Sequence, residues 1–272
     1  MPELAEVDTT KRDLKKILIG KRICKVEVFL DKIVYNKKDE FIKSSEGQTV
    51  LDVKRRGKWL LFELDSNYII IHFRMEGRFY FRKKGDSLSK HEHVSLLLDD
   101  TIEMRFHDVR KFGRMILLPK YEVLNIKPLS DLGYEFNDPR LTEEYLLAKF
   151  KNKSTPIKTV LLDQSIIAGI GNIYDDEILY QSHINPLKPA KEINSSEAIE
   201  IIENTKIILE KAIKKGGTTI KSFESSEGVH GLFQNELAVH GKKNGICSKC
   251  GSKIEFIRVG GRGTYYCPNC QK

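Results

Sequence analysis

The sequence lacks the features of a membrane or secreted protein. It contains no run of 18 apolar residues, and its basic N-terminal segment is not followed by an apolar stretch, so we expect neither a spanning helix nor a signal peptide. Cysteine is scarce, with 5 in 272 residues, and the spacing does not indicate a disulfide framework. The sequence therefore predicts a protein of a reducing, cytoplasmic compartment.

Acidic residues are outnumbered by basic ones. Lys and Arg number 46 against 38 Asp and Glu, which gives a formal charge of +8 and a pI near 9.1. This excess favours a polyanionic partner whose binding weakens with salt. Charge alone leaves open the alternative of a generic basic protein.

The first 130 residues contain mainly short strand-like segments, a pattern typical of an antiparallel β-sandwich. Residues 3–18 predict a helix with proline in its first turn, and alternating apolar residues on either side of Asp99-Asp100 predict a hairpin. The other expected strands are 23–30, 49–53, 59–64, 68–73, 78–81 and 114–118. We expect an α+β protein that begins with a catalytic β-sandwich domain at 1–130.

The period of the apolar residues becomes helical after Leu132. Helices are expected at 142–150, 156–164, 172–182 and 196–214. A region rich in glycine and polar residues follows, and then a segment that holds four of the five cysteines. We expect a helical domain at 131–235 and a small terminal module at 236–272.

The terminal module has the spacing of a zinc site. Cys247 and Cys250 form one Cys-x-x-Cys pair, Cys267 and Cys270 form a second, and 16 residues separate the pairs. Two such pairs supply the four sulfurs of a tetrahedral Zn²⁺ site. The sequence between them predicts a hairpin with 260–263 as its turn, which places Arg262 where a guanidinium could grip phosphate. The alternative is a ribbon that only braces the C-terminus.

The N-terminus offers an unusual nucleophile if the initiator methionine is removed. Pro2 then carries a free secondary amine, and α-amines have pKa values near about 8, against about 10.4 for lysine. Addition of this amine to a sugar C1′ gives an iminium, which acts as an electron sink. Glu3 is adjacent and can move a proton, and Glu6 lies one turn further on. A well-formed helix start is the ordinary alternative.

Four separated motifs resemble the bacterial formamidopyrimidine-DNA glycosylase family. They are Met1-Pro2-Glu3-Leu4-Ala5-Glu6, Arg55-Arg56-Gly57-Lys58-Trp59-Leu60, Gly169-Ile170-Gly171-Asn172-Ile173-Tyr174 and Gly261-Arg262-Gly263-Thr264 with the following cysteine pair. The resemblance implies a monomeric, nucleoid-associated base-excision enzyme with one structural Zn²⁺. Such an enzyme removes oxidised purines from double-stranded DNA and nicks the strand by β,δ-elimination. It also implies a helix–two-turn–helix module and a zinc finger beside the sandwich.

The resemblance also implies roles for individual residues. Catalysis would use Pro2 as the nucleophile, Glu3 and Glu6 for proton transfer, Lys58 near the lesion and Arg262 on phosphate. Contacts to DNA would come from Met75, Arg110 and Phe112, which fill the gap of an extruded base, and from His91, Lys153, Lys158 and Asn172 along the backbone. Residues 217–235 match the loop that closes over the extruded base.

Two departures and two rival functions remain. Ala5 stands where the family usually has proline, and Asp8 where glutamate is usual, although neither is a reacting group. An endonuclease VIII-type enzyme for oxidised pyrimidines shares the fold, the amine and the zinc. A non-catalytic zinc-ribbon DNA-binding protein explains the charge and the metal site but not Pro2 before Glu3.

Overall fold

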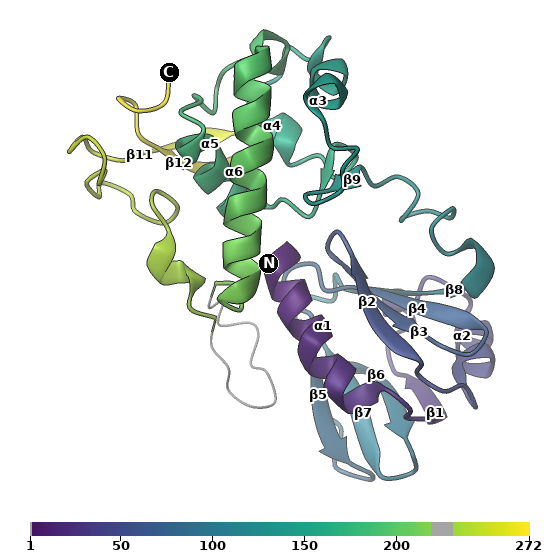
Figure 1. Cartoon of the computed structure of the whole chain (residues 1–272). Coiled ribbons are helices and arrows are strands. Elements are labelled where there is room, and N and C mark those ends of the chain that lie inside the picture. Colours follow the sequence, from purple (N-terminus) through teal and green to yellow (C-terminus); the bar gives the residue numbers. More distant parts are fainter. Residues whose placement is uncertain (1, 219–230) are drawn as a thin grey trace. The chain divides into compact units, whose positions relative to one another are not determined.

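The computed structural model describes residues 2–218 and 231–272 (Figure 1). These residues divide into two compact units, one formed by residues 2–130 and the other by residues 131–218 together with 232–272. The expected lesion loop falls largely on residues 219–230, which lie outside the described residues. Within the described residues, no helix is both long and apolar enough to cross a membrane.

The first unit is built on two four-stranded antiparallel sheets, with strand orders β1-β6-β7-β5 and β2-β3-β4-β8. The strands of the first sheet are β1 Ile23–Val28, β6 Glu92–Leu98, β7 Ile102–His107 and β5 Arg78–Lys83. Those of the second are β2 Asp52–Arg56, β3 Trp59–Glu63, β4 Asn67–His72 and β8 Arg114–Pro119. The expected sandwich and its hairpin around Asp99-Asp100 are confirmed.

Alternation along the strands builds the core of this unit. Val94 and Leu96 of β6 lie opposite Phe106 and Met104 of β7, and all four are buried. They share one apolar cluster with residues of the other sheet such as Ile69. Two facing sheets with inward apolar residues therefore hold the unit together through removal of apolar surface from water.

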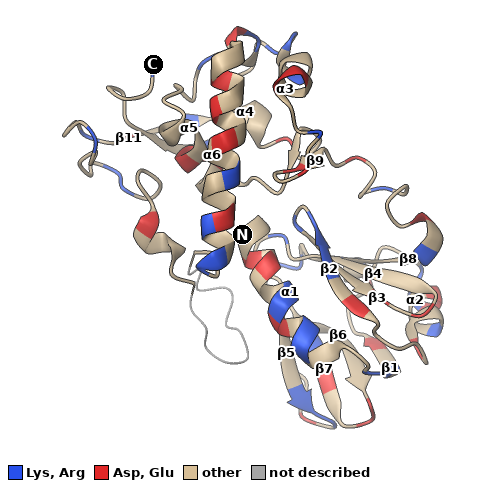
Figure 2. Ribbon diagram, viewed as in Figure 1, with Lys and Arg blue, Asp and Glu red and all other residues tan. Residues whose placement is uncertain are grey.

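Helix α1, Leu4–Leu18, packs against β2 of the second sheet. The sequence predicted proline in its first turn, but Glu3 is the N-cap and Pro2 precedes it. The reason is a capping box, in which the side chains of Glu3 and Glu6 each accept the backbone N–H of the other. Figure 2 shows acidic residues near the start of α1 and basic ones in its later turns, an order that suits the helix dipole.

One helix was not expected from the sequence, and one strand begins later than expected. Helix α2, Lys38–Ser45, contacts β1 of one sheet and β4 and β8 of the other. Strand β2 lies three residues later than expected, because it runs on to a two-residue turn, Gly57-Lys58, where Arg56 pairs with Trp59. Short 3₁₀ turns at Asp31–Ile33 and Lys120–Glu122 complete the unit.

The second unit is helical, with a small hairpin. Its helices are α3 Glu143–Phe150, α4 Ile157–Leu161, α5 Asn172–Gln181 and α6 Ser195–Lys214, with 3₁₀ turns at Ala190–Glu192 and Phe233–Glu236. Two-residue strands β9 Tyr134–Glu135 and β10 Ile167–Ala168 pair in parallel. Helix α6 begins with a capping box formed by Asn194 and Glu197, so local sequence alone fixes its start.

The terminal hairpin consists of β11 Glu255–Val259 and β12 Arg262–Tyr266. Val259 pairs with Arg262, so the turn is Gly260-Gly261 rather than the expected four residues. Both glycines have positive φ, 55° and 77°, as a type I′ turn requires. Arg262 is therefore the first residue of β12, beside the tip rather than at it.

Candidate functional site

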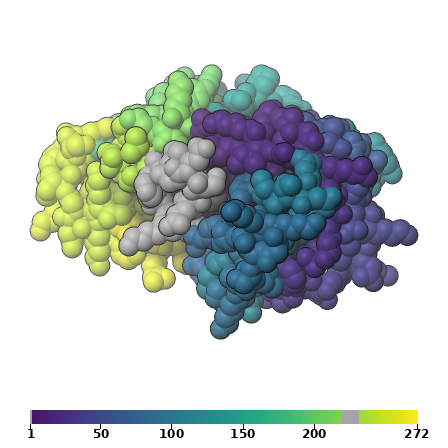
Figure 3. Space-filling model, turned by 90° about the horizontal axis from the view of Figure 1, so that it is seen from below, coloured from purple at the N-terminus to yellow at the C-terminus, as the bar shows by residue number. Residues whose placement is uncertain are grey.

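The four cysteines of the hairpin module form a metal site. Their sulfur atoms lie within 4.8 Å of one another, and Cys247 Sγ to Cys270 Sγ and Cys250 Sγ to Cys267 Sγ measure 3.8 and 3.5 Å. A tetrahedron with Zn–S bonds of about 2.3 Å has edges of about 3.8 Å. The sulfurs therefore fit one Zn²⁺, as the spacing predicted. Figure 3 shows this C-terminal finger at the surface in yellow.

The turn of the finger rests on the helical module. A Cβ on Gly260 would lie 2.6 Å from Thr159 Oγ1 of α4, so only glycine permits this approach at this φ. Arg262, next to the turn, is exposed. A rigid, metal-braced hairpin thus presents a guanidinium to solvent, which suits phosphate binding.

Asn172 contacts the strand that begins with Arg262. It is the first residue of α5, after the N-cap Gly171, as the expected start of a helix at residue 172 requires. Its Nδ2 donates to Gly263 O at 2.9 Å, while its buried Oδ1 has no hydrogen-bond partner among the described residues. The helix N-terminus and the finger are therefore joined through Asn172, which bonds to the residue that follows Arg262.

Lys158 does not fit its predicted role. Its side chain is fully buried, so it cannot touch phosphate in this structure. Its Nζ instead pairs with Asp176 and lies 3.5 Å from Asp175 Oδ2, and it donates to Asn172 O at 3.3 Å. A buried lysine needs such partners because desolvation of its charge is costly. Lys158 therefore supports the start of α5 from within.

Asp176 extends this buried cluster to the finger. His240 Nδ1 lies 2.6 Å from Asp176 Oδ2, and Tyr265 N donates to the same oxygen at 3.3 Å. The sequence offered no signal for this cluster, because Asp175 and Asp176 read as solvent-facing positions at a helix start.

Lys153, another predicted contact to the DNA backbone, lies just after α3 and is half-buried.

The predicted nucleophile lies at the start of α1. Pro2 is buried, and Glu3 and Glu6 are 2% and 4% exposed. Glu3 N donates to Glu6 Oε2 at 2.9 Å. Glu6 is thus occupied in orienting the chain around Glu3, which favours a positioning role for Glu6 over proton transfer. Ala5 is completely buried in the same turn.

The turn with Lys58 is tied to α1. Arg55 Nε lies 3.5 Å from Asp8 Oδ1, and Arg55 Nη1 donates to Gly57 O at 2.8 Å. Gly57 has a φ of 55°, and Lys58 is only 6% exposed. The same arginine therefore fixes the turn that holds Lys58 and attaches it to the helix that begins near Pro2.

His72 supports the predicted wedge residue Met75. Its Nδ1 accepts the N–H of Arg74 at 2.9 Å, and Arg74 has a φ of 55°. This bond holds the start of the turn in which Met75 lies half-buried. His72 also packs edge-on against Trp59 at 4.9 Å, so it joins the Lys58 turn to the Met75 turn. No pattern in the sequence indicates this role for His72.

His72 predicts acid sensitivity of the first unit. Burial, with the charges of Arg74 and Lys58, lowers the pKa of His72 to about 3, whereas a histidine in the unfolded chain titrates near about 6.5. Between these pH values the unfolded state binds the extra proton, so stability falls as the pH drops below about 6.5. Between pH 7 and pH 5, the free energy of unfolding should therefore fall by about 2 kcal/mol less in His72→Asn than in wild type.

Urea unfolding followed by the fluorescence of Trp59, the single tryptophan, measures this difference. His183→Asn, at an exposed histidine of the other unit, is the control and should keep the wild-type dependence. Equal pH dependence in His72→Asn and wild type would contradict the prediction.

Arg110 and Phe112 share a loop that Asp108 organises. The carboxylate of Asp108 accepts the N–H of Arg110 at 3.0 Å and that of Gly113 at 2.7 Å. The Arg110 guanidinium lies 5.0 Å from the ring centroid of exposed Phe112. The sequence does not indicate this role, because Asp108 is one of several acidic residues near charged neighbours.

Asp108 also holds the predicted backbone contact His91. Its N–H donates to His91 O at 2.9 Å, and its carbonyl lies 2.8 Å from Nε2 of buried His93. His91 is half-buried, and its ring packs edge-on against that of His107. The structure therefore groups His91, Arg110 and Phe112 on one support.

A buried ion pair fixes the strand that follows His91. Arg105 Nη1 donates to Glu92 Oε2 at 2.9 Å, and both residues are nearly inaccessible. Arg105 also donates to the carbonyls of Asp86 and Ser87. Although burial opposes it, bonds from Ser89 and Arg105 hold the pKa of Glu92 below its usual range. The pair therefore anchors the loop before His91. From the sequence alone, its two residues look like ordinary charged positions in strands.

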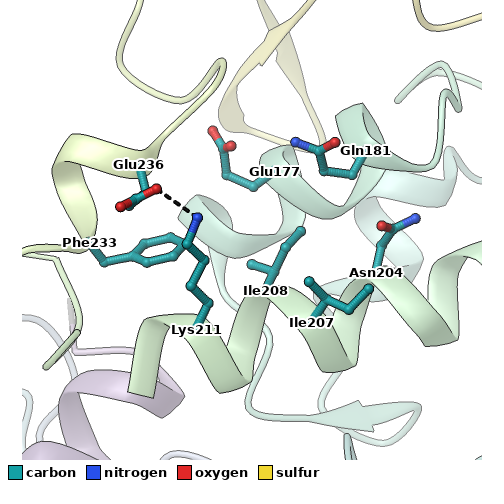
Figure 4. Close-up of a pocket in the computed structure, with 8 residues that line it drawn as sticks. All are labelled: Glu177, Gln181, Asn204, Ile207, Ile208, Lys211, Phe233 and Glu236. Carbon is teal, nitrogen blue, oxygen red and sulfur yellow. Dashed lines mark hydrogen bonds and ion pairs between the residues drawn. The ribbon is translucent and has the colours of Figure 1, made fainter. Parts of the chain in front are cut away.

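A separate cavity of about 260 Å³ lies in the second unit (Figure 4). Its lining is Glu177, Gln181, Asn204, Ile207, Ile208, Lys211, Phe233 and Glu236. Lys211 Nζ and Glu236 Oε2 form an ion pair at 2.7 Å. The carboxylate of Glu177 already accepts the N–H groups of Ala238, Val239 and His240. None of the predicted site residues lines this cavity.

Models of three families match the chain in order. The formamidopyrimidine-DNA glycosylase N-terminal domain matches residues 1–115, the formamidopyrimidine-DNA glycosylase H2TH domain matches 132–224, and the zinc finger found in FPG and IleRS matches 247–272. These matches cover both sides of the boundary at residue 130 as well as the cysteine module.

Similar proteins and structures agree. Proteins named formamidopyrimidine-DNA glycosylase from Bacillus cereus and Brevibacillus brevis are each 43% identical over the whole chain and 99% of their own length. A Lactococcus lactis FPG variant in complex with Fapy-dG-containing DNA superposes with a TM-score of 0.94 at 35% identity, with complete coverage of both chains. The Lactococcus lactis protein with DNA containing an abasic site gives 0.92 at 35% identity and the same coverage.

Proposed function

Because the chain belongs to the formamidopyrimidine-DNA glycosylase family, a family of DNA glycosylases that act on damaged DNA, we propose that it excises oxidised purines. The substrates are 8-oxoguanine and formamidopyrimidines in duplex DNA. The nucleophile is the free amine of Pro2, and the same enzyme then nicks the strand as an AP lyase.

The observation that carries this proposal is the placement of Pro2, Glu3 and Lys58 on connected elements. Pro2 and Glu3 precede α1, and the capping box fixes the backbone of Glu3. The Arg55–Asp8 contact links α1 to the turn with Lys58. An amine nucleophile beside a carboxylate, with a cation held nearby, is suited to attack on a sugar carbon.

The proposed reaction proceeds by covalent catalysis. The Pro2 nitrogen forms a bond to C1′ as the bond from C1′ to the damaged base breaks, and the base leaves with a proton. The amine loses its own proton, the C1′–O4′ bond of the sugar then opens as O4′ takes up a proton, and the resulting iminium withdraws electrons from C2′. Removal of a C2′ proton expels the 3′-phosphate, a second elimination expels the 5′-phosphate, and water then releases Pro2. Glu3 is the proposed proton carrier at the amine.

We assign different tasks to the parts of the chain. In residues 1–130, Met75, Arg110 and Phe112 fill the space of the extruded base, and His91 contacts the backbone. In 131–235 and 236–272, Lys153, Asn172 and Arg262 grip phosphate, while the finger holds Zn²⁺. Lys158 acts only through Asn172, because its own amino group is buried.

Lesion preference tests the proposed substrate. We expect excision of 8-oxoguanine opposite cytosine to be at least about tenfold faster than excision of thymine glycol, measured as single-turnover rates on matched duplexes. The endonuclease VIII-type alternative predicts the reverse order. A relative, wild-type Lactococcus lactis FPG, has been crystallised with DNA containing an oxidised pyrimidine, so the pyrimidine substrate is a meaningful competitor. Faster excision of thymine glycol would overturn the substrate assignment without affecting the amine chemistry.

A further inference from the structure

Tyr180, near the end of α5, contacts the metal site from outside its ligand set. Its side chain is 1% exposed and belongs to an apolar cluster with Val239, Cys247 and Ile254. Its hydroxyl oxygen lies 3.2 Å from Cys247 Sγ. The amino group of Lys249 lies 4.9 Å from the centroid of the phenol ring. The hydroxyl therefore has a sulfur as its neighbour in a place that water hardly reaches.

The direction of this hydrogen bond follows from the metal. A cysteine that binds Zn²⁺ does so as a thiolate, which has no proton to donate. The phenol O–H must then be the donor. We propose that Tyr180 is a positioning residue of the zinc site, whose hydroxyl donates to the metal-bound Cys247 thiolate and slows the loss of Zn²⁺.

Charge explains why one hydrogen bond has a large effect here. Four thiolates around one Zn²⁺ leave an excess of negative charge, and Cys247 carries its share in apolar surroundings at 1% exposure. A donor to the sulfur spreads this charge and stabilises the thiolate in its apolar surroundings, so detachment of the ligand from the metal becomes harder. Partners of this kind typically change metal affinity by about 10- to 100-fold.

The end of α5 holds the phenol in place. Beyond Tyr180, His183 Nδ1 lies 3.1 Å from Cys270 O, and Lys272 N donates to His183 O. Gln271 Nε2 donates to Ile184 O at 2.9 Å. The segment that follows Tyr180 thus grips the second cysteine pair while Tyr180 contacts the first. These bonds restrict the end of α5 on which the phenol is carried, so the hydrogen bond to the sulfur costs little additional entropy.

Transfer of zinc to a chelator tests the proposal on the full-length protein. We expect Tyr180→Phe, which keeps the ring, to release Zn²⁺ to 4-(2-pyridylazo)resorcinol about tenfold faster than wild type. In protein loaded with Co²⁺, the thiolate-to-metal charge-transfer band should move to lower energy, because the sulfur becomes more electron-rich. If the Tyr180 ring supports the finger by packing alone, the variant should show no such spectral shift.

The matched control is Tyr266→Phe. The hydroxyl of Tyr266 donates to Glu255 Oε2 at 2.9 Å within the same finger. Its removal should leave both the rate of zinc release and the Co²⁺ spectrum at wild-type values. Equal release rates and identical spectra in wild type and Tyr180→Phe would overturn the proposal. If Tyr180→Phe does not fold, the test uses Co²⁺-loaded protein that contains 3-fluorotyrosine, whose hydroxyl is a stronger donor. The charge-transfer band should then lie at higher energy than in wild type. An unmoved band would overturn the proposal. Neither readout depends on the substrate.

Discussion

Retention of Met1 should abolish the covalent adduct that borohydride traps between the protein and DNA containing an abasic site. With Met1 in place, the Pro2 nitrogen belongs to an amide, whose lone pair is delocalised and cannot attack C1′. Pro2→Gly should still lose at least about tenfold in trapping rate, because a primary amine gives an imine that must be protonated before it can withdraw electrons. Gel quantification of the adduct, with intact mass of each protein, measures both effects.

Two lysine variants separate this mechanism from attack by a side chain. Lys58→Gln and Lys54→Gln remove the amino groups near the β2–β3 turn, and Lys54 already pairs with Glu63 at the surface of that hairpin. Both should retain the adduct on abasic DNA, since the nitrogen in the adduct is that of Pro2. An adduct that persists with Met1 retained but disappears in Lys58→Gln would assign the nucleophile to Lys58 and refute our mechanism.

Removal of zinc should cause the second large loss, of about 100-fold in DNA affinity. The β11–β12 hairpin has only two short strands, and such a hairpin is marginal without further support. Loss of the metal therefore releases Arg262, and it also releases Gly263, whose carbonyl holds Asn172. Fluorescence anisotropy with Cys250→Ala across a salt titration measures the effect, and an unchanged affinity would mean that the finger is only a brace.

A pair of arginines on the same hairpin localises the contact. Arg262→Gln should reduce the slope of log affinity against log salt by about one, as expected for one lost phosphate contact. Arg258 is also exposed and pairs with Gly263 across the hairpin. Arg258→Gln should stay close to wild type if the contact belongs to Arg262 in particular. Equal losses in the two variants would indicate a diffuse charge effect.

The sequence was sufficient where local rules decide the structure. The Cys-x-x-Cys spacing predicted the metal site, and alternation around Asp99-Asp100 predicted β6 and β7. Helix α6, expected at 196–214, was placed to within one residue, because helical periodicity and the glycines that follow Lys214 mark its extent. These signals involve neighbours in the chain, so no knowledge of distant contacts was needed.

The sequence was insufficient where the environment of a residue depends on distant segments. Lys158 reads as a surface cation, but Asp175 and Asp176 of another helix draw it into a buried cluster. Asp108 and His72 look ordinary, although each shapes a loop with predicted site residues. Strand β2 was misplaced because its end is set by pairing with β3, which a single segment does not reveal.

The cluster around Asp176 limits how this protein can be re-engineered. It joins α4, α5 and the finger through Lys158, His240 and Tyr265. A chimera that took residues 236–272 from a relative would keep Lys158 and any backbone N–H in the place of Tyr265, but it would need its own partner for Asp176 in the place of His240. Exchange of fingers between such enzymes should therefore succeed best when the graft carries a histidine at this position or takes α5 with it.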